Sequence, residues 1–199
     1  MIAVHQKEGS KVSLQQDRAS RHDAGGSTGQ SLMVGPISQD DWSFIWPLLK
    51  EAFADGDSYP CPVDMLETDA RAYWLAPSHL VFVARSEEND ILGTYYLRTD
   101  QDGLGDHICN CGFVVAKSAR GQGLAGLMCA HAETVARQKG YLGMRFNLVV
   151  ATNRAGLRAW SKAGFQIVGT VPRAFRHREL GLVDAHIMFK WISDNPGQA

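Results

Sequence analysis

The sequence lacks the features that mark secreted, membrane-spanning or nucleic-acid-binding proteins. Its 199 residues include only four cysteines, which form no paired framework, and no apolar run approaches the length of a membrane span. The net charge of −1 gives no general attraction to nucleic acid or to an anionic membrane. We therefore expect a cytoplasmic protein with reduced cysteines, and with neither nucleic acid nor membrane among its partners.

The chain contains enough apolar residues to form one hydrophobic core. A hydrophobic content of 45% in a chain of 199 residues predicts a single domain. Residues 1–31 are rich in Gly, Ser, Gln and charge without a sustained period, which predicts a flexible N-terminal extension. The domain is expected over residues 32–192, followed by a C-terminal tail at 193–199.

Hydrophobic periodicity predicts the element order β-α-α-β-β-β-α-β-α-β-β. The helices are expected at 38–54, at 63–74, from Gly123 onward and at 153–162. The strands are expected at 32–37, 80–84, 91–97, 107–115, 144–150, 165–171 and 182–192. The last strand alternates between apolar and mostly polar residues, with Val183, Ala185, Ile187 and Phe189 on one face. The order implies a single-domain α/β fold, a mixed central sheet with helices on both faces.

One stretch, residues 112–126, carries the strongest chemical signal. It reads as a buried strand, a short basic loop and a glycine-rich start of a helix. Glycines there let the backbone approach a ligand, and the first-turn N–H groups of a helix have no partner inside it. Arg120 adds a positive charge. The stretch therefore predicts a binding site for a pyrophosphate.

Two common nucleotide motifs do not fit this stretch. Residues 121–126 spell G-x-G-x-x-G, but the loop at 116–120 is too long for a dinucleotide-binding turn. The next strand, which runs out at Thr152, has no acidic residue at its tip. A Walker-type phosphate loop is excluded because no Lys-Ser/Thr pair follows the glycines.

A third pattern does fit. Arg120, Gly123 and Ala125 satisfy Arg/Gln-x-x-Gly-x-Gly/Ala, which resembles the coenzyme A loop of the GCN5-related N-acetyltransferase (GNAT) family. Residues 153–165 are similar to the family's second motif, Asn-x-x-Ala-x-x-Leu-Tyr-x-Lys-x-Gly-Phe. The resemblance covers residues 32–192. It implies an N-acetyltransferase that uses acetyl-CoA as co-substrate, without a metal, and transfers acetyl directly to an amine.

Three shorter stretches, at 56–60, 107–113 and 146–149, look like the subgroup that contains the yeast proline-analogue acetyltransferase. That enzyme acetylates azetidine-2-carboxylate and related imino acids. By that likeness Asn110 and Asn147 would hold the acceptor and serve the catalytic step, and Asn153 would lie against the coenzyme A arm. Asp57 and Tyr59, in the first stretch, would add to the acceptor site.

In such folds the strands that carry Asn110 and Asn147 separate at their ends, so that pantetheine can continue the sheet through backbone hydrogen bonds. A backbone N–H near Asn110 or Cys111 would then stabilise the oxyanion. The expected coenzyme A contacts, besides Asn153, are Phe113, Val114, Val115, Arg120, Gly121, Gln122, Gly123, Leu124, Ala125 and Gly126.

The sequence departs from the family at the usual general acid. The Tyr of the second motif is here Trp160, whose indole N–H cannot protonate a leaving thiolate. A thiolate with a pKa of about 8.5 leaves without much help, so the loss need not abolish turnover. The base stays open between Asp106, His107, the loop pair Asp57 and Tyr59, and a water held by Asn110.

The strand that precedes Phe113 also contains residues that could form a zinc site or provide a cysteine nucleophile. His107, Cys109 and Cys111 share one strand face, but a zinc site needs further ligands, so ordinary packing is the expectation. A cysteine nucleophile would need an adjacent base and a lowered pKa, and neither is visible in the sequence.

Three functions remain open. The first is N-acetylation of a small amine, amino acid or imino acid, which the near-neutral charge and the asparagines favour. The second is N-acetylation of protein termini or lysines. The third is a non-catalytic coenzyme A-binding sensor, favoured only by Trp160. The resemblance also raises a homodimer, with the last strand as candidate interface.

Overall fold

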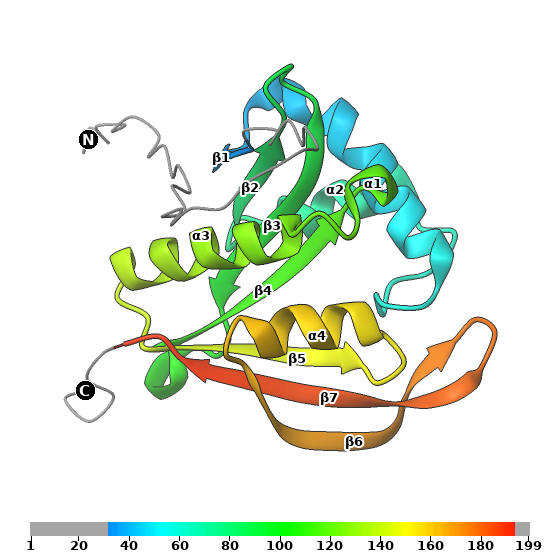
Figure 1. Ribbon diagram of the computed structural model, residues 1–199, viewed down its shortest axis with the longest axis vertical. Helices are drawn as coiled ribbons and strands as arrows, with labels where there is room; N and C mark the ends of the chain where they lie inside the picture. Colours follow the sequence, from blue (N-terminus) through cyan, green and yellow to red (C-terminus); the bar gives the residue numbers. More distant parts are fainter. Residues whose placement is uncertain (1–31, 194–199) are drawn as a thin grey trace, which may run out of the picture.

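The computed structural model describes residues 32–193, so the predicted N-terminal extension and nearly all of the predicted tail lie outside the described residues. The described chain forms one 7-stranded sheet in the order β1-β2-β3-β4-β5-β7-β6 (Figure 1). Neighbouring strands are antiparallel except β4 and β5, which are parallel. The strands are β1 (Met33–Pro36), β2 (Leu80–Arg85), β3 (Ile91–Thr99), β4 (Ile108–Val115), β5 (Gly143–Val150), β6 (Gln166–His177) and β7 (Gly181–Trp191).

Four α-helices in the described chain cover the two faces of the sheet. They are α1 (Trp42–Asp55), α2 (Glu67–Trp74), α3 (Leu124–Gln138) and α4 (Arg154–Lys162). α1 and α2 pack with buried residues of β2, β3 and β4 on one face, whereas α3 and α4 form a second core on the other (Figure 1). The predicted α/β class, the mixed sheet and the order of elements are confirmed.

Local sequence signals set most element ends. A capping box between Ser38 and Asp41 precedes α1, and Gly56 ends that helix in the left-handed region at φ +62°. The Asn153 side chain accepts the Gly156 N–H and begins α4, as its sequence position predicts. These caps satisfy backbone groups that helix ends leave unpaired.

Two element boundaries differ from the prediction in ways that involve identifiable contacts. α2 begins at Glu67 rather than near residue 63, and the Glu67 carboxylate accepts the Trp42 indole N–H at 2.8 Å. β6 continues through Pro172 to His177, whereas the sequence predicts an end at residue 171. The proline is tolerated because β6 is an edge strand and its ladder with β7 shifts register between Val171 and Phe175.

The last strand is half-buried and antiparallel as expected, and each of its faces has one buried residue, Ala185 on the apolar face and Met188 on the other. Met188 is fully buried in the core beneath α3, whereas Ile187 and Phe189 are only half-buried. The Met188 side is the one that α3 and α4 cover. Alternation alone identifies two faces, but the placement of the helices decides which one they cover.

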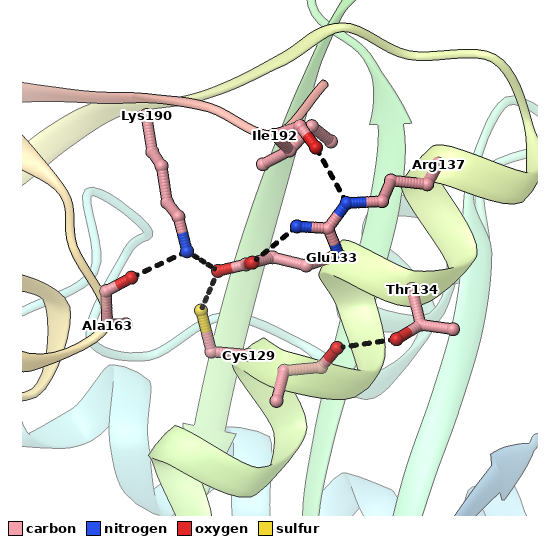
Figure 2. Close-up of polar contacts among 8 residues, drawn as sticks. Cys129, Glu133, Thr134, Arg137, Ala163, Lys190 and Ile192 are labelled. Carbon is pink, nitrogen blue, oxygen red and sulfur yellow. Dashed lines mark hydrogen bonds and ion pairs between the residues drawn. The ribbon is translucent and has the colours of Figure 1, made fainter. Parts of the chain in front are cut away.

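A buried ionic network joins β7 to both helices on that face (Figure 2). Glu133 of α3 is 7% exposed and accepts Lys190 Nζ at 2.6 Å, and Arg137 lies 3.4 Å from its second oxygen. Lys190 also donates to the carbonyl of Ala163, where α4 ends, and Arg137 donates to the carbonyl of Ile192. Two cations thus satisfy a carboxylate that would otherwise be costly to bury, and the two backbone oxygens accept further hydrogen bonds from those cations.

Candidate functional site

The parallel strands β4 and β5 stay together over only three residue pairs. These pairs are Ile108 with Gly143, Cys109 with Met144 and Asn110 with Arg145. Beyond them the strands diverge, as Figure 1 shows, and residues 111–115 of β4 have no ladder partner on β5. We call this region, between residues 111–115 and 146–150, the β4–β5 opening. It confirms the expected separation of the two strands and leaves a backbone edge on β4.

Asn110 accounts for the point at which the ladder ends. Its Nδ2 donates to the carbonyl oxygen of Arg145 at 2.8 Å, so a side chain takes the acceptor that a further N–H of β4 would otherwise use. Next along β4, Gly112 lies beneath the ring of Tyr96, where an added Cβ would come within 2.5 Å of a ring carbon. Only glycine fits that position without displacing the ring.

The carbonyl of Phe113, on β4 beside the opening, accepts a hydrogen bond from the Tyr59 hydroxyl at 3.0 Å. Tyr59 comes from the α1–α2 connection and packs against Phe53 and Trp74, with ring centroids 5.4 and 6.0 Å away. Burial raises the pKa of Tyr59 well above its usual value. The phenol therefore stays protonated at neutral pH and acts as a hydrogen-bond donor, which argues against its role as the base.

On the opposite face of the sheet, Trp160 of α4 packs across the two diverging strands. Its ring centroid lies 5.0 Å from that of Phe113 on β4 and 5.0 Å from that of Phe146 on β5. The indole is half-buried against the core beneath α3 and α4. At this position Trp160 packs beside the opening. Its indole cannot act as a general acid there.

The glycine loop before α3 is open to an anion. Gly121 and Gly123 have left-handed φ angles of +79° and +83°, and no heavy atom lies within 4 Å of a Cβ built on either residue. Gly123 is the N-cap of α3 and offers no side chain to the first-turn N–H groups. Residues 121–123 are exposed, and Leu124 is buried beneath them. This geometry fits the pyrophosphate of coenzyme A.

Two basic side chains of the same loop are held by α1. Arg120 lies 3.6 Å from an Asp55 carboxylate oxygen, and Lys117 lies 2.9 Å from the other Asp55 oxygen and 3.3 Å from Glu51. All of these groups are substantially exposed, so the ion pairs are weak and the cations remain available to a phosphate. Lys117 was not anticipated, since it falls outside the glycine motif.

Asn153 has a structural partner of its own. Its Oδ1 accepts the Gly156 N–H at 2.9 Å, so the side chain caps α4. An added Cβ at Gly156 would lie 2.9 Å from Asn153 Nδ2, and this chain has glycine where the second motif has Ala. The contact predicted between Asn153 and the coenzyme A arm stays a prediction.

Asn147 of β5 belongs to a cluster of polar side chains that links β5 to the end of β3. Its Nδ2 donates to Asp100 Oδ1 at 3.0 Å, and Asp100 also forms an ion pair with Arg145. Asp100 follows β3 and is 6% exposed, whereas Asn147 itself is exposed. Register places Asn110 opposite Arg145, so both predicted acceptor asparagines lie on the face that α1 and α2 share. Asp100 and Arg145 were missed because neither belongs to a local motif.

The α1–α2 connection is tied to the turn between β6 and β7. The Arg178 N–H donates to the carbonyl of Gly56 at 3.0 Å, and Arg178 Nη1 donates to the carbonyl of Ala54 at 2.8 Å. Asp57 follows directly and is half-buried. The turn therefore fixes the loop that carries Asp57 and Tyr59.

The cysteines of β4 are packing residues. Cys109 and Cys111 are buried in the core, and burial raises the pKa of the Cys111 thiol well above its usual range. A thiol in that state is a poor nucleophile. Within residues 32–193 no three His, Cys, Asp or Glu side chains are grouped so as to hold a metal ion.

Two surface hollows lie away from the β4–β5 opening. One of about 340 Å³ lies beside α1 and is lined by residues including Trp46 and Leu66. The other, of about 540 Å³, lies between Phe44 and the β2–β3 turn. Neither contains a residue of β4 or β5. None of the helices in the described residues has the length and apolar character needed to cross a membrane.

Comparisons with known proteins bear on this geometry. The sequence model of the acetyltransferase (GNAT) family matches residues 42–165. The N-acetyltransferase aca1 of Schizosaccharomyces pombe is 28% identical over 148 residues, which cover 66% of this chain and 71% of that protein.

Solved structures are similar as well. A GCN5-related N-acetyltransferase from Kribbella flavida has 31% sequence identity and a TM-score of 0.77, covering 80% of this chain and 97% of that one. A phosphinothricin acetyltransferase from Sinorhizobium meliloti, in complex with acetyl-CoA, has 13% identity and a TM-score of 0.72, covering 80% of this chain and 88% of that one. The second likeness concerns the fold alone.

Proposed function

Because the chain belongs to the GNAT acetyltransferase family, and is therefore an acetyl-CoA-dependent N-acetyltransferase, we propose that it acetylates the amine of a small molecule, with amino or imino acids as the acceptor class. The family predicted from the two sequence motifs is confirmed. The likeness to the yeast proline-analogue subgroup is consistent with the match to the fission-yeast enzyme.

The observation that carries the proposal is the orientation of the two asparagines. Both Nδ2 groups already donate, Asn110 to the Arg145 carbonyl and Asn147 to the Asp100 carboxylate. Each amide must therefore present its Oδ1 elsewhere, and within residues 32–193 neither Oδ1 has a hydrogen-bond partner. Two free acceptors beside the β4–β5 opening suit the N–H groups of a neutral amine, which they would orient for attack.

Coenzyme A binding is assigned to the elements on the other side of the opening. The backbone edge of residues 113–115, which has no ladder partner on β5, would bond pantetheine as an added strand, and the α3 N-terminus with Arg120 would bind pyrophosphate. Bound there, acetyl-CoA supplies the thioester that the amine attacks. The new C–N bond replaces the C–S bond, the thiol leaves, and the amine gives up one proton.

The residues of this chain would lower the barrier to acetyl transfer chiefly by positioning the amine and the thioester. A backbone N–H near Asn110 or Cys111 is proposed to donate to the oxyanion, a role worth about 3 kcal/mol for one donor. Trp160 would exclude water from the thioester, and it leaves the thiol without a general acid in the second motif. The proton acceptor is proposed to be Asp57 or a water held by Asn110, since Tyr59 stays protonated.

A small acceptor is favoured over a polypeptide by the contact of Arg178 with Gly56 and Ala54. This contact joins the β6–β7 turn to the α1–α2 loop on the acceptor side, which reduces the room for an extended chain. The near-neutral net charge of −1 also offers no general attraction to basic histone-like or acidic protein targets.

The test is release of thiol from acetyl-CoA against amino acids, imino acids, polyamines and short peptides. We expect release with amino or imino acids, and Asn110→Ala and Asn147→Ala should each raise the acceptor KM. Release with peptides alone would replace the proposal with protein N-acetylation. Tight acetyl-CoA binding without release from any acceptor would favour the non-catalytic sensor.

The cytoplasmic location is proposed from the four cysteines, which form no paired framework, and the homodimer is proposed from the resemblance alone. β7 lies between β5 and β6, so a dimer through a free sheet edge would use β6, which exposes Ile167, Val168 and Val171. Light scattering after gel filtration measures the mass directly, and a monomer would refute the dimer.

A further inference from the structure

We propose that Arg98 binds a carboxylate of the acceptor and thereby selects amino or imino acids over simple amines. The inference rests on the proposed function, because it names the second recognition group of the same acceptor. It assigns a specificity residue on β3, a strand that neither sequence motif includes.

The sheet register places Arg98 beside the acceptor asparagine. Arg98 of β3 lies opposite Asn110 of β4, and Asn110 lies opposite Arg145 of β5. Residues directly opposite each other project from the same face, with Cβ atoms about 5 Å apart. Asn110 is thus flanked by two guanidinium side chains in one row across three strands.

The two arginines differ in their partners. Arg145 is paired with the buried carboxylate of Asp100, so its charge is already balanced. Arg98 donates from Nη1 to the carbonyl of Thr99 at 3.1 Å, and within residues 32–193 no carboxylate lies at ion-pair distance from it. A guanidinium has five N–H donors, so most of those on Arg98 remain free. The row therefore carries one uncompensated positive charge.

The surroundings of Arg98 strengthen its interaction with an anion. Tyr96 and His79 stack with ring centroids 4.2 Å apart, and Tyr73 bonds the Tyr96 hydroxyl at 3.2 Å. Burial lowers the pKa of His79 below 6.5, and the charge of Arg98 lowers it further, so His79 is neutral at pH 7. A half-buried cation beside three aromatic rings is less well hydrated than one on an open surface, and its charge-assisted hydrogen bonds gain accordingly.

Asn110 and Arg98 in this row suit the amine and the carboxylate of an α-amino or imino acid, respectively. The amine would meet the free Oδ1 of Asn110, and the carboxylate would meet the guanidinium of Arg98 on the adjacent strand. These groups are joined through one carbon in such an acid, and neighbouring residues of a row are about 5 Å apart. An acceptor without the carboxylate would leave Arg98 unpaired.

The test compares three matched acceptors, azetidine-2-carboxylate, its carboxamide and azetidine, by thiol release from acetyl-CoA. The wild-type enzyme should prefer the acid. Arg98→Met should raise the KM for the acid by roughly 10- to 100-fold, the effect of losing a charge-assisted hydrogen bond, with little change for the other two acceptors. Arg98→Lys should restore part of the loss, and the acetyl-CoA KM should stay constant.

Arg158→Met, on the exposed surface of α4, is the matched control for loss of one arginine and should leave all three KM values unchanged. Equal use of acid and carboxamide by the wild-type enzyme would overturn the role of Arg98 while leaving small-amine acetylation intact. An equal weakening of all three acceptors by Arg98→Met would overturn that role as well. Thiol release with peptides alone would overturn the proposed function itself, and Arg98 with it. The wild-type comparison needs no variant, so poor folding of Arg98→Met would not leave the question open.

Discussion

The two halves of the sheet are built differently. β1 to β4 form an antiparallel series that α1 and α2 cover on one face, where Trp74 is fully buried, and α3 covers on the other, where Tyr95 and Leu97 are fully buried. The other half, β5, β7 and β6, ends in a strand that is exposed along most of its length. Three residue pairs of the β4–β5 ladder join the halves. Because the backbone ladder is this short, side-chain contacts must supply much of the remaining connection between the two halves of the sheet.

Those side-chain connections lie on both faces. On the face of α1 and α2, Asn110, Arg145, Asn147 and Asp100 cross the junction with hydrogen bonds and one ion pair. On the other face, Glu133 and Lys190 cross from α3 to β7. The first group lies beside the β4–β5 opening and includes the proposed acceptor residues, whereas the second is remote from it. One junction should therefore serve both stability and catalysis, and the other stability alone.

Asp100→Ala should have the largest effect, because it acts on both properties. It leaves the Arg145 guanidinium, whose Nε is already buried without a partner among the described residues, with no counter-charge. We expect a loss of about 3 kcal/mol in the free energy of unfolding. A fall in kcat/KM of roughly 100-fold should accompany it, because Asn147 is no longer held in position.

Urea denaturation and acceptor kinetics measure the two effects of Asp100→Ala separately. Asp100→Asn keeps an acceptor for the Asn147 amide and should retain more activity than Asp100→Ala. Unchanged acceptor kinetics in a destabilised Asp100→Ala protein would show that this junction is purely structural.

Glu133→Ala should affect stability alone. It leaves Lys190 and Arg137 without their buried carboxylate, so we again expect a loss of about 3 kcal/mol in the free energy of unfolding. Because the network lies on the far face from the asparagines, the acceptor KM at a permissive temperature should not change. A large rise in that KM would contradict the division between the two junctions.

Gly112→Ala should weaken the opening on its β4 side. The new methyl group would overlap the Tyr96 ring, and overpacking of this kind costs roughly 2 kcal/mol. The shifted ring should also raise the acceptor KM, since Tyr96 lies beside Arg98 on the same face. Gly35→Ala on β1, where nothing lies within 4 Å of the added Cβ, is the control and should be close to neutral. Thermal unfolding ranks the two.

Gly123→Ala should show the smallest effect on stability and a selective one on cofactor binding. A left-handed φ of +83° costs alanine about 1 kcal/mol. Gly140→Ala, at φ +87° beyond the other end of α3, carries the same strain without the proposed pyrophosphate site. Both variants should lose similar stability, and only Gly123→Ala should raise the acetyl-CoA KM. Equal acetyl-CoA KM values would refute the site.

The sequence predicted what local signals encode. The glycines at 121 and 123, the Asn153 cap and the alternation of the strands led to the fold, the family and the helix end proposed for pyrophosphate. Through resemblance it also led to Asn110 and Asn147 as the proposed acceptor residues. It could not predict that Asp100, Arg145 and Arg98 lie beside them. Their proximity follows from strand register between residues 12 positions apart, as for Arg98 and Asn110, or 45 positions apart, as for Asp100 and Arg145, and no periodic pattern records it.

The contacts of Arg178 with Ala54 and Gly56 affect the order in which parts of the chain can fold during synthesis. Ala54 and Gly56 receive their partner from a residue 124 positions later than Ala54, so the loop that holds Tyr59 stays incomplete during synthesis until the last hairpin has emerged. α1 and the first strands can assemble through nearer contacts well before that moment. The β6–β7 hairpin then completes the proposed acceptor side, so the proposed means of positioning an amine would arise only when the fold is closed.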